Sequence, residues 1–323
     1  MILVMFLLLS HNDTGKEDVM YKGKGIEYWR ALMLDRGASA YLVRKDFPLI
    51  EKPDPLAVPL LRSLLVDNAA DVRQAALYCL AYLGEGAFPA LPEIERCLSD
   101  EDPDVQSAAA RAIGSIGPKA GKAGPVLLKL LKSPDSPIRN SAALASLLAK
   151  VNQDEAILAL RPEIEDKSGS PSTIFMELSE CKGNEKVVQL FREIVSTPKQ
   201  FDSWKRARAA EGLGLICANG DVLKGILKPA LTDDDLGVRV AAAHSLALTK
   251  NADPVSIDVL IGVVKYPKTS PYALDTTIRC LELCGAKAAK ANEYLLEIAQ
   301  HHSDETIRDL ARKALKAIAM PDK

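Results

Sequence analysis

The chain has few of the residues that catalytic and nucleic-acid-binding proteins use most. Aromatic residues make up 5% of its 323 residues, and only four residues are histidine. The 41 basic and 43 acidic residues give a net charge of −2, without the basic excess that nucleic-acid binding normally requires. Because 48% of the residues are apolar and few of these are aromatic, we expect a core of aliphatic side chains and alanine.

Motifs that carry chemistry are missing as well. The six cysteines form no CxxC pair, and no glycine-rich phosphate loop, GxSxG motif or zinc-ligand spacing occurs. His301 and His302 stand beside Asp304, but adjacent ligands on one turn form a poor metal cage, so a solvated turn is expected. Free cysteine packs as a small hydrophobic residue. The sequence therefore predicts a protein that is not an enzyme and has no catalytic residue, cofactor or metal.

Long apolar runs are also lacking, apart from Met1–Leu9. Nine residues are too few for a transmembrane helix, which needs about 20. This segment is consistent with the remnant of a signal peptide, with a weak membrane tether, or with a frayed apolar end. The first two predict an extracytoplasmic or membrane-tethered protein, and the third a cytoplasmic one. Residues 1–25 are expected to comprise this segment and a polar linker.

A regular interval organises the rest of the chain. Pro59, Pro92 and Pro125 follow one another at 33 residues. The pairs Val72-Arg73, Val105-Gln106 and Ile138-Arg139 have the same spacing. A fixed period of this length indicates one supersecondary unit repeated along the chain.

The second half of each unit has the pattern of an α-helix. We number its positions from an anchor, the residue that opens this second helix; the anchors are Val43, Val72, Val105, Ile138, Ser170, Lys205, Val238, Ala273 and Ile307. Position +4 is mostly alanine and position +8 mostly leucine or isoleucine, and both lie on the anchor's side of a helix. A small residue followed one turn later by a large one is what close packing of stacked helices requires.

The first half of each unit also predicts a helix, because each of the three prolines suits a helical first turn. Gly84 and Gly117 are placed to end second helices, and Pro118 prevents continuation. Each unit is therefore expected to be a helical hairpin.

These motifs resemble those of HEAT repeats, and most of all the bacterial repeats called phycobilisome-lyase HEAT-like. The best copies are DNAADVRQAALYCLAYLG (67–84) and DEDPDVQSAAARAIGSIG (100–117). The resemblance implies an all-α fold, a right-handed α-solenoid of about nine hairpins over residues 26–323, with a degenerate unit around 157–200. It also implies a ladder of Asp and Arg side chains between units, to which Asp67 with Arg73 and Asp233 with Arg239 were assigned. Gln106 and Ser133 would interrupt this ladder.

Two further segments have specific expectations. Residues 21–32, YKGKGIEYWRAL, precede the array, and the apolar stripe Ile26, Trp29, Leu32 and Met33 is predicted to cap its open end. Trp204-Lys205-Arg206-Ala207-Arg208 is the one basic-aromatic cluster of the chain. It gives a weak indication of DNA binding, or packs beside the degenerate unit.

The exposed surface of the second helices is the predicted contact surface. Positions +2 and +6 point away from the buried side of the helix, and position +6 mixes charges of both signs with apolar residues. This mixture favours a protein or peptide partner over nucleic acid. The predicted function is a non-catalytic scaffold; the alternatives are a lyase-type accessory subunit, as the resemblance implies, and DNA binding. The proposed partner-binding residues are Tyr78, Arg111, Glu211, His244, Arg279 and Lys313.

Overall fold

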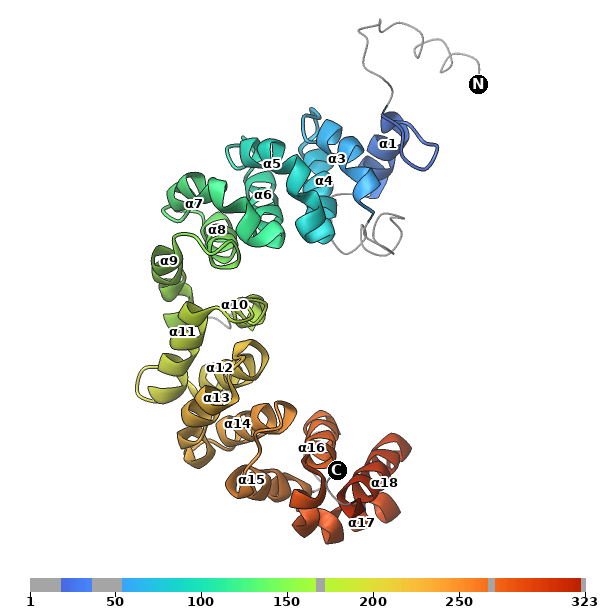
Figure 1. Ribbon diagram of the computed structural model, residues 1–323, viewed down its shortest axis with the longest axis vertical. Coiled ribbons are helices and arrows are strands. Elements are labelled where there is room, and N and C mark those ends of the chain that lie inside the picture. The colour runs from blue at the N-terminus through green and yellow to red at the C-terminus, as the bar shows by residue number, and fades with distance from the viewer. Residues whose placement is uncertain (1–18, 37–53, 167–171, 267–270, 321–323) are drawn as a thin grey trace, which may run out of the picture. The chain divides into compact units, whose positions relative to one another are not determined.

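The computed structural model describes residues 19–36, 54–166, 172–266 and 271–320, and these are helical apart from short turns. In these ranges no strand occurs, only an isolated bridge between Tyr21 and Lys24. None of the helices in the described ranges is long and apolar enough to cross a membrane. The chain divides into two compact units, Met1–Ala156 and Ile157–Lys323, and the division falls within helix α9 (Gln153–Glu165). The fold is an all-α, HEAT-like solenoid, and within each unit successive hairpins pack on one another (Figure 1).

In the first unit, short first helices alternate with longer second helices. The second helices α4, α6 and α8 pack side by side in chain order, and each also contacts the first helix before it, α3, α5 or α7. A 3-10 helix precedes each first helix. The bounds are α1 Ile26–Arg36, η1 Pro55–Ala57, α3 Val58–Leu64, α4 Ala70–Leu83, η2 Gly84–Ala90, α5 Leu91–Cys97, α6 Pro103–Ile116, η3 Gly117–Ala123, α7 Gly124–Leu130 and α8 Ser136–Leu148.

Local chemistry explains where these helices begin and end. The three prolines at intervals of 33 residues lie in the first turns of α3, α5 and α7, as predicted. Asp102 and Asp135 accept hydrogen bonds from the free N–H groups at the starts of α6 and α8. Gly84 and Gly117 follow α4 and α6 with φ of 56° and 74°, a conformation that costs glycine nothing. The predicted helix ends are confirmed, whereas the 3-10 helices were not foreseen.

The predicted small and large columns are buried. The alanines at position +4 have 0% exposure, and so have most of the large residues at position +8. Leu315, at position +8 of the last helix, is the exception and is half-buried. The +4 alanines are Ala76, Ala109, Ala142, Ala209, Ala242 and Ala311. The alternation predicted from the sequence therefore forms the core.

Helix α1 caps the first unit by packing on α3 and α4. Within α1, Trp29 and Met33 are buried, while Ile26 and Leu32 are half-buried. The Trp29 ring lies 5.5 Å from the ring of Tyr21, whose hydroxyl donates to Asp54 at 2.8 Å. The predicted cap is confirmed. The Val43 anchor and Met1–Leu9 lie outside the described residues.

The second unit repeats the hairpin arrangement. The second helices α12, α14, α16 and α18 pack in chain order, and each also contacts a first helix, α11, α13, α15 or α17. The bounds are α10 Ser172–Leu178, α11 Glu185–Ser196, α12 Ser203–Ile216, α13 Gly220–Leu227, η4 Pro229–Thr232, α14 Leu236–Leu248, α15 Pro254–Val264, α16 Pro271–Cys284, η5 Gly285–Ala291, α17 Asn292–His301 and α18 Glu305–Ala319.

The segment 157–200, for which a degenerate unit is predicted, includes the seven-residue helix α10 and has an aromatic core. Phe175 and Phe191 stack with their ring centres 5.8 Å apart, and Trp204 meets Phe175 edge-on at 6.0 Å. Glycine makes room for these rings, since a Cβ atom on Gly212 would lie 2.2 Å from Phe191. The Ser170 anchor lies outside the described residues.

Candidate functional site

The residue at position +1 of the second helices anchors the turn before it. In α4, α6, α8, α14 and α18 its side-chain N–H donates to the carbonyl oxygen six residues upstream, whereas Arg206 of α12 donates to Phe201 O, five residues upstream. Arg73 donates to Asp67 O at 2.9 Å and Gln106 to Asp100 O at 2.7 Å. The same bond is made by Arg139 to Ser133, Arg239 to Asp233 and Arg308 to His302. These side chains therefore serve the fold.

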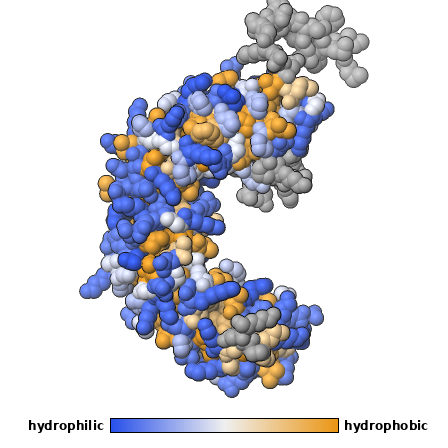
Figure 2. Space-filling model, in the orientation of Figure 1, coloured by the Kyte–Doolittle hydropathy of each residue, from blue (hydrophilic) through white to orange (hydrophobic). Residues whose placement is uncertain are grey.

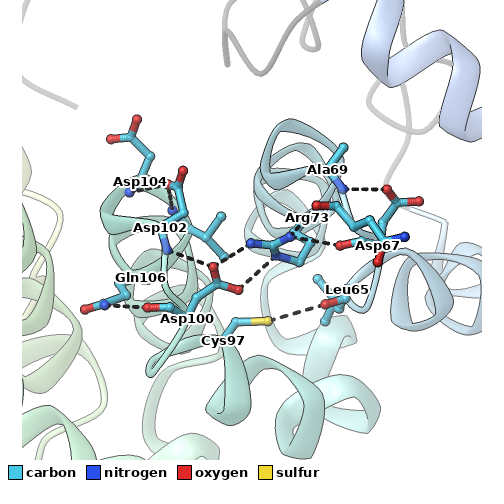
Figure 3. A network of polar contacts seen from close by, with 11 residues as sticks. Leu65, Asp67, Ala69, Arg73, Cys97, Asp100, Asp102, Asp104 and Gln106 are labelled. Carbon is cyan, nitrogen blue, oxygen red and sulfur yellow. Dashed lines mark hydrogen bonds and ion pairs between the residues drawn. The ribbon is translucent and has the colours of Figure 1, made fainter.

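Arg73 also binds a residue of the next helical hairpin. Its Nη2 and Nε atoms donate to the two oxygens of Asp100 at 2.6 and 2.9 Å (Figure 3). The two side chains are 9% and 11% exposed. Burial alone would raise the pKa of Asp100, but the bonds from Arg73 and the Asp102 N–H outweigh it and lower that pKa. The pair is a shielded, bidentate link between neighbouring hairpins of the first unit.

The ladder connects different residues from those assigned in the sequence. Arg73 and Arg239 bind main-chain oxygens of Asp67 and Asp233, and the carboxylates of these aspartates belong to other arginines. Arg30 of the cap binds Asp67 at 2.6 Å, and Arg206 binds Asp233 at 2.7 and 3.1 Å. The assignment of each carboxylate to the arginine six residues downstream was wrong. Arg73 and Arg206 instead bind the aspartate of the next hairpin along the chain. The 27-residue spacing shared by Arg73 with Asp100 and Arg206 with Asp233 is the signal that finds the pairs.

The basic-aromatic cluster is largely buried. Lys205 is 1% exposed and donates to the Asp166 carbonyl at 2.7 Å, and its ammonium lies 5.5 Å from the Trp204 ring centre. Arg206 is 7% exposed and is held by Asp233. These two charges are not available to a phosphate backbone, and Trp204 packs beside the aromatic core. Arg208, the third basic residue of the cluster, is exposed and binds Glu211 at 2.7 Å. DNA binding stays a prediction that this cluster supports only weakly.

In the first unit, the outer face of the second helices presents mixed side chains. Tyr78 of α4 is half-buried and Arg111 of α6 is exposed. At position +10, which continues the line of positions +2 and +6, stand the exposed Tyr82 and Ser115 and the half-buried Leu148. This face is polar at its centre.

In the second unit, charged residues on this face form ion pairs within their own helices. Glu211 binds Arg208 at 2.7 Å, and Arg279 binds Asp275 at 2.8 Å. Lys313 of α18 is exposed. Because these pairs join residues three or four positions apart, they neutralise the face without linking the helices.

His244, a member of the predicted set, contacts another helix. Its Nε2 atom lies 3.0 Å from the hydroxyl of Thr277 on α16. That hydroxyl donates to the Ala273 carbonyl, so His244 Nε2–H is the donor in the bond to Thr277. Burial lowers the pKa of His244 to about 4.

A row of leucines lies beside these residues. Leu215 of α12, Leu248 of α14 and Leu283 of α16 occupy position +10 and are 59%, 54% and 51% exposed. Helices α12 and α14 are close, since a Cβ atom on Gly214 would lie 2.7 Å from Ser245, and α14 packs on α16. We call these three residues the leucine row. The sequence analysis missed it, although its spacings of 33 and 35 residues repeat the period of the chain.

The chain matches family models over two stretches. Residues 57–87 match a model described as HEAT repeat, and residues 91–171 match one described as HEAT repeats. This chain contains HEAT repeats. A search of curated protein sequences finds no match to it.

Solved structures support the HEAT fold over most of the chain. Importin beta is 14% identical, with a TM-score of 0.51 over 92% of this chain and 45% of that one. Kap121p bound to the SUMO protease Ulp1p is 15% identical, with a TM-score of 0.51 over 92% of this chain and 39% of that one. The phycocyanin lyase complex of CpcE and CpcF from Nostoc sp. PCC7120 is 20% identical, with a TM-score of 0.35 over 85% and 98%. The chain thus spans less than half of importin beta and less than half of Kap121p. The alternative of a lyase-type accessory subunit stays a prediction.

The buried cysteines of the HEAT repeats have raised thiol pKa values and are therefore poor nucleophiles. Five of the six cysteines are buried, and burial raises the pKa of Cys79 to about 12 and that of Cys97 to about 11. In the ranges that the structure describes, no three His, Cys, Asp or Glu side chains lie together in a way that could hold a metal ion. The side chains that remain candidates for function lie on the exposed faces.

Proposed function

We propose that this HEAT-repeat protein is a non-catalytic scaffold that binds a protein or peptide along the outer face of its second helices. HEAT solenoids bury one side of each helix and leave long exposed faces that typically bind other proteins. Of the residues predicted to bind this partner, Arg111, Glu211, Arg279 and Lys313 are exposed, whereas Tyr78 and His244 are half-buried.

The leucine row is the observation that supports this proposal most. Three consecutive second helices each expose more than half of a leucine at one register position, although the buried positions already supply the core. Apolar side chains aligned across several helices indicate an interaction surface, whereas single exposed leucines are ordinary. Figure 2 shows hydrophobic patches within a largely hydrophilic surface on the face in view. A contact surface with an apolar row and neutralised charges suits a protein partner.

Site-specific photo-cross-linking tests the proposal. A photoreactive residue placed at Leu248 should form adducts with a protein partner in a native lysate, identified by mass spectrometry. The matched control is the same residue at Leu296 of the first helix α17, which is 49% exposed and lies outside this face. Equal adducts at both positions would contradict the proposal.

Charge reversal gives an independent measurement. R111E and R279E should weaken recovery of the partner identified at Leu248 without changing the circular dichroism spectrum, because both residues are exposed. Unchanged recovery would exclude the +6 positions from the contact, and the leucine row would then be tested by L215S/L248S.

A further inference from the structure

A second surface feature lies on the first-helix side of the second unit. It is an open pocket of about 570 Å³ among α13, α15 and η5. Three lysines line it: Lys224 from α13 and Lys287 and Lys290 from η5. None of the predicted partner-binding residues and no member of the leucine row lines this pocket, so it is separate from the face discussed above.

Two of the three lysines have no acidic partner among the described residues. Lys290 lies 3.6 Å from Asp258, while Lys224 and Lys287 are exposed and form no ion pair within those ranges. Three lysines and two aspartates line the pocket, so its charged side chains leave an excess of positive charge, which favours an anionic ligand. Charge complementarity therefore requires an acidic ligand.

The carboxylates of the pocket narrow the chemistry of the ligand. Asp253 accepts the Ser256 N–H at 2.9 Å and forms a capping box at the start of α15, so one of its oxygens is committed. Asp258 is 59% exposed and accepts from a single lysine. A free phosphate would be repelled by both groups. A peptide offers N–H donors to them and carboxylates to the lysines.

The rest of the wall is apolar. Ala252, Pro254 and the buried Ile257 line it between the charged groups. Its volume is within the range of pockets that hold a compact ligand, so an apolar side chain of the ligand can be accommodated. Lysine stems add further apolar surface.

We infer that this lysine pocket binds an acidic peptide segment that carries an apolar side chain between its carboxylates. The lysines bind the carboxylates, Asp258 accepts a main-chain N–H, and the apolar side chain lies against Pro254 and Ile257. The inference does not depend on the proposed function, because the pocket is formed by α13, α15 and the 3-10 helix η5 and not by the outer face of the second helices.

Fluorescence anisotropy with a short fluorescein-labelled peptide, in which glutamates flank one phenylalanine, tests the inference. The wild-type chain should bind this peptide, and K224E/K287E should weaken binding at least about tenfold, because two attractive charges become repulsive. K224R/K287R should retain most of the binding. K129E, at an exposed lysine of α7 in the first unit, makes the same kind of change away from the pocket and should have no effect.

Three results would overturn the inference: no binding of the peptide by the wild-type chain, equal binding by K224E/K287E, or equal binding of a peptide with glutamine in place of glutamate. Circular dichroism of each variant confirms folding, and the arginine variant separates charge from structure. L248S should leave peptide binding unchanged. Failure of this experiment therefore leaves the scaffold proposal standing, and failure of cross-linking at Leu248 leaves this one standing.

Discussion

Each of the two units of this chain contains a buried Arg–Asp ion pair of the same kind, but the exposed surfaces of the two units differ. Arg73 with Asp100 in the first unit and Arg206 with Asp233 in the second have matching distances, and all four side chains are about one tenth exposed. Yet Arg73 follows a regular turn, whereas Arg206 follows the aromatic segment and donates to Phe201 O at 2.8 Å. The pair therefore depends on spacing and helix stacking more than on the neighbouring sequence.

The outer faces differ at equivalent positions. Position +10 is Ser115 on α6 of the first unit and Leu248 on α14 of the second, and both are exposed. Buried positions repeat because every unit must fill the same space, while exposed positions are free of that requirement. The difference indicates that partner recognition is to be sought in the exposed layer, and four experiments test this comparison.

The largest effect is expected from breaking the buried pairs. R73A and R206A each leave a shielded carboxylate without its partner, which typically costs about 3–5 kcal/mol of the free energy of unfolding. Urea denaturation should give similar losses for the two variants. R62A is the control, because Arg62 is 43% exposed in its pair with Glu93, and it should lose about 1 kcal/mol or less. Markedly unequal losses in R73A and R206A would show that the two links are not equivalent.

A pH-dependent loss of stability is expected in the second unit. Burial lowers the pKa of His244 from 6.5 to about 4, so between these values the unfolded chain binds a proton that the folded chain does not. The free energy of unfolding should therefore fall as the pH falls through this window, by about 3 kcal/mol at most.

The equivalent residue of the first unit supplies the control for His244. Leu144 stands at position +6 of α8, so H244L places that residue in the second unit. Urea denaturation of H244L should show a flatter pH dependence between 6.5 and 4. The same slope in both proteins would assign the effect to other groups.

A smaller effect is expected where glycine allows close packing. G212A puts a Cβ atom 2.2 Å from Phe191 and should cost about 1–3 kcal/mol in thermal or urea unfolding. G114A in the first unit meets Ala145 only at 3.1 Å, and the gain in helix propensity offsets part of its cost. F191L in the G212A background should recover stability. A larger loss in G114A than in G212A would contradict the comparison.

The smallest effect on stability is expected at position +10. L248S and S115L exchange exposed residues between the units and should each change the free energy of unfolding by about 0.5 kcal/mol or less. In the cross-linking experiment with the photoreactive residue at Leu283, L248S should reduce adducts and S115L should not. A large loss of stability in L248S would show that the leucine row belongs to the core.

Much of the fold was accessible from the sequence. The prolines of α3, α5 and α7, the glycines that follow α4 and α6, and the alanine column at position +4 were predicted because each acts within one helix or turn. The carboxylate partners of the arginines were not predicted. Asp100 lies 27 residues beyond Arg73, and its position depends on how the next hairpin packs on the one that carries Arg73. The leucine row was also missed, because only two of the three outward positions of each second helix were considered.

The sequence by itself determined that the chain forms repeated helical hairpins, because the 3.6-residue turn converts a fixed spacing of apolar residues into a buried stripe. Tertiary structure decided which arginine meets which aspartate, how closely Gly212 and Phe191 approach, and that Lys224 lines one pocket with Lys287 and Lys290. Those contacts join residues from different helices, and their distances are set by the packing of one helix on the next.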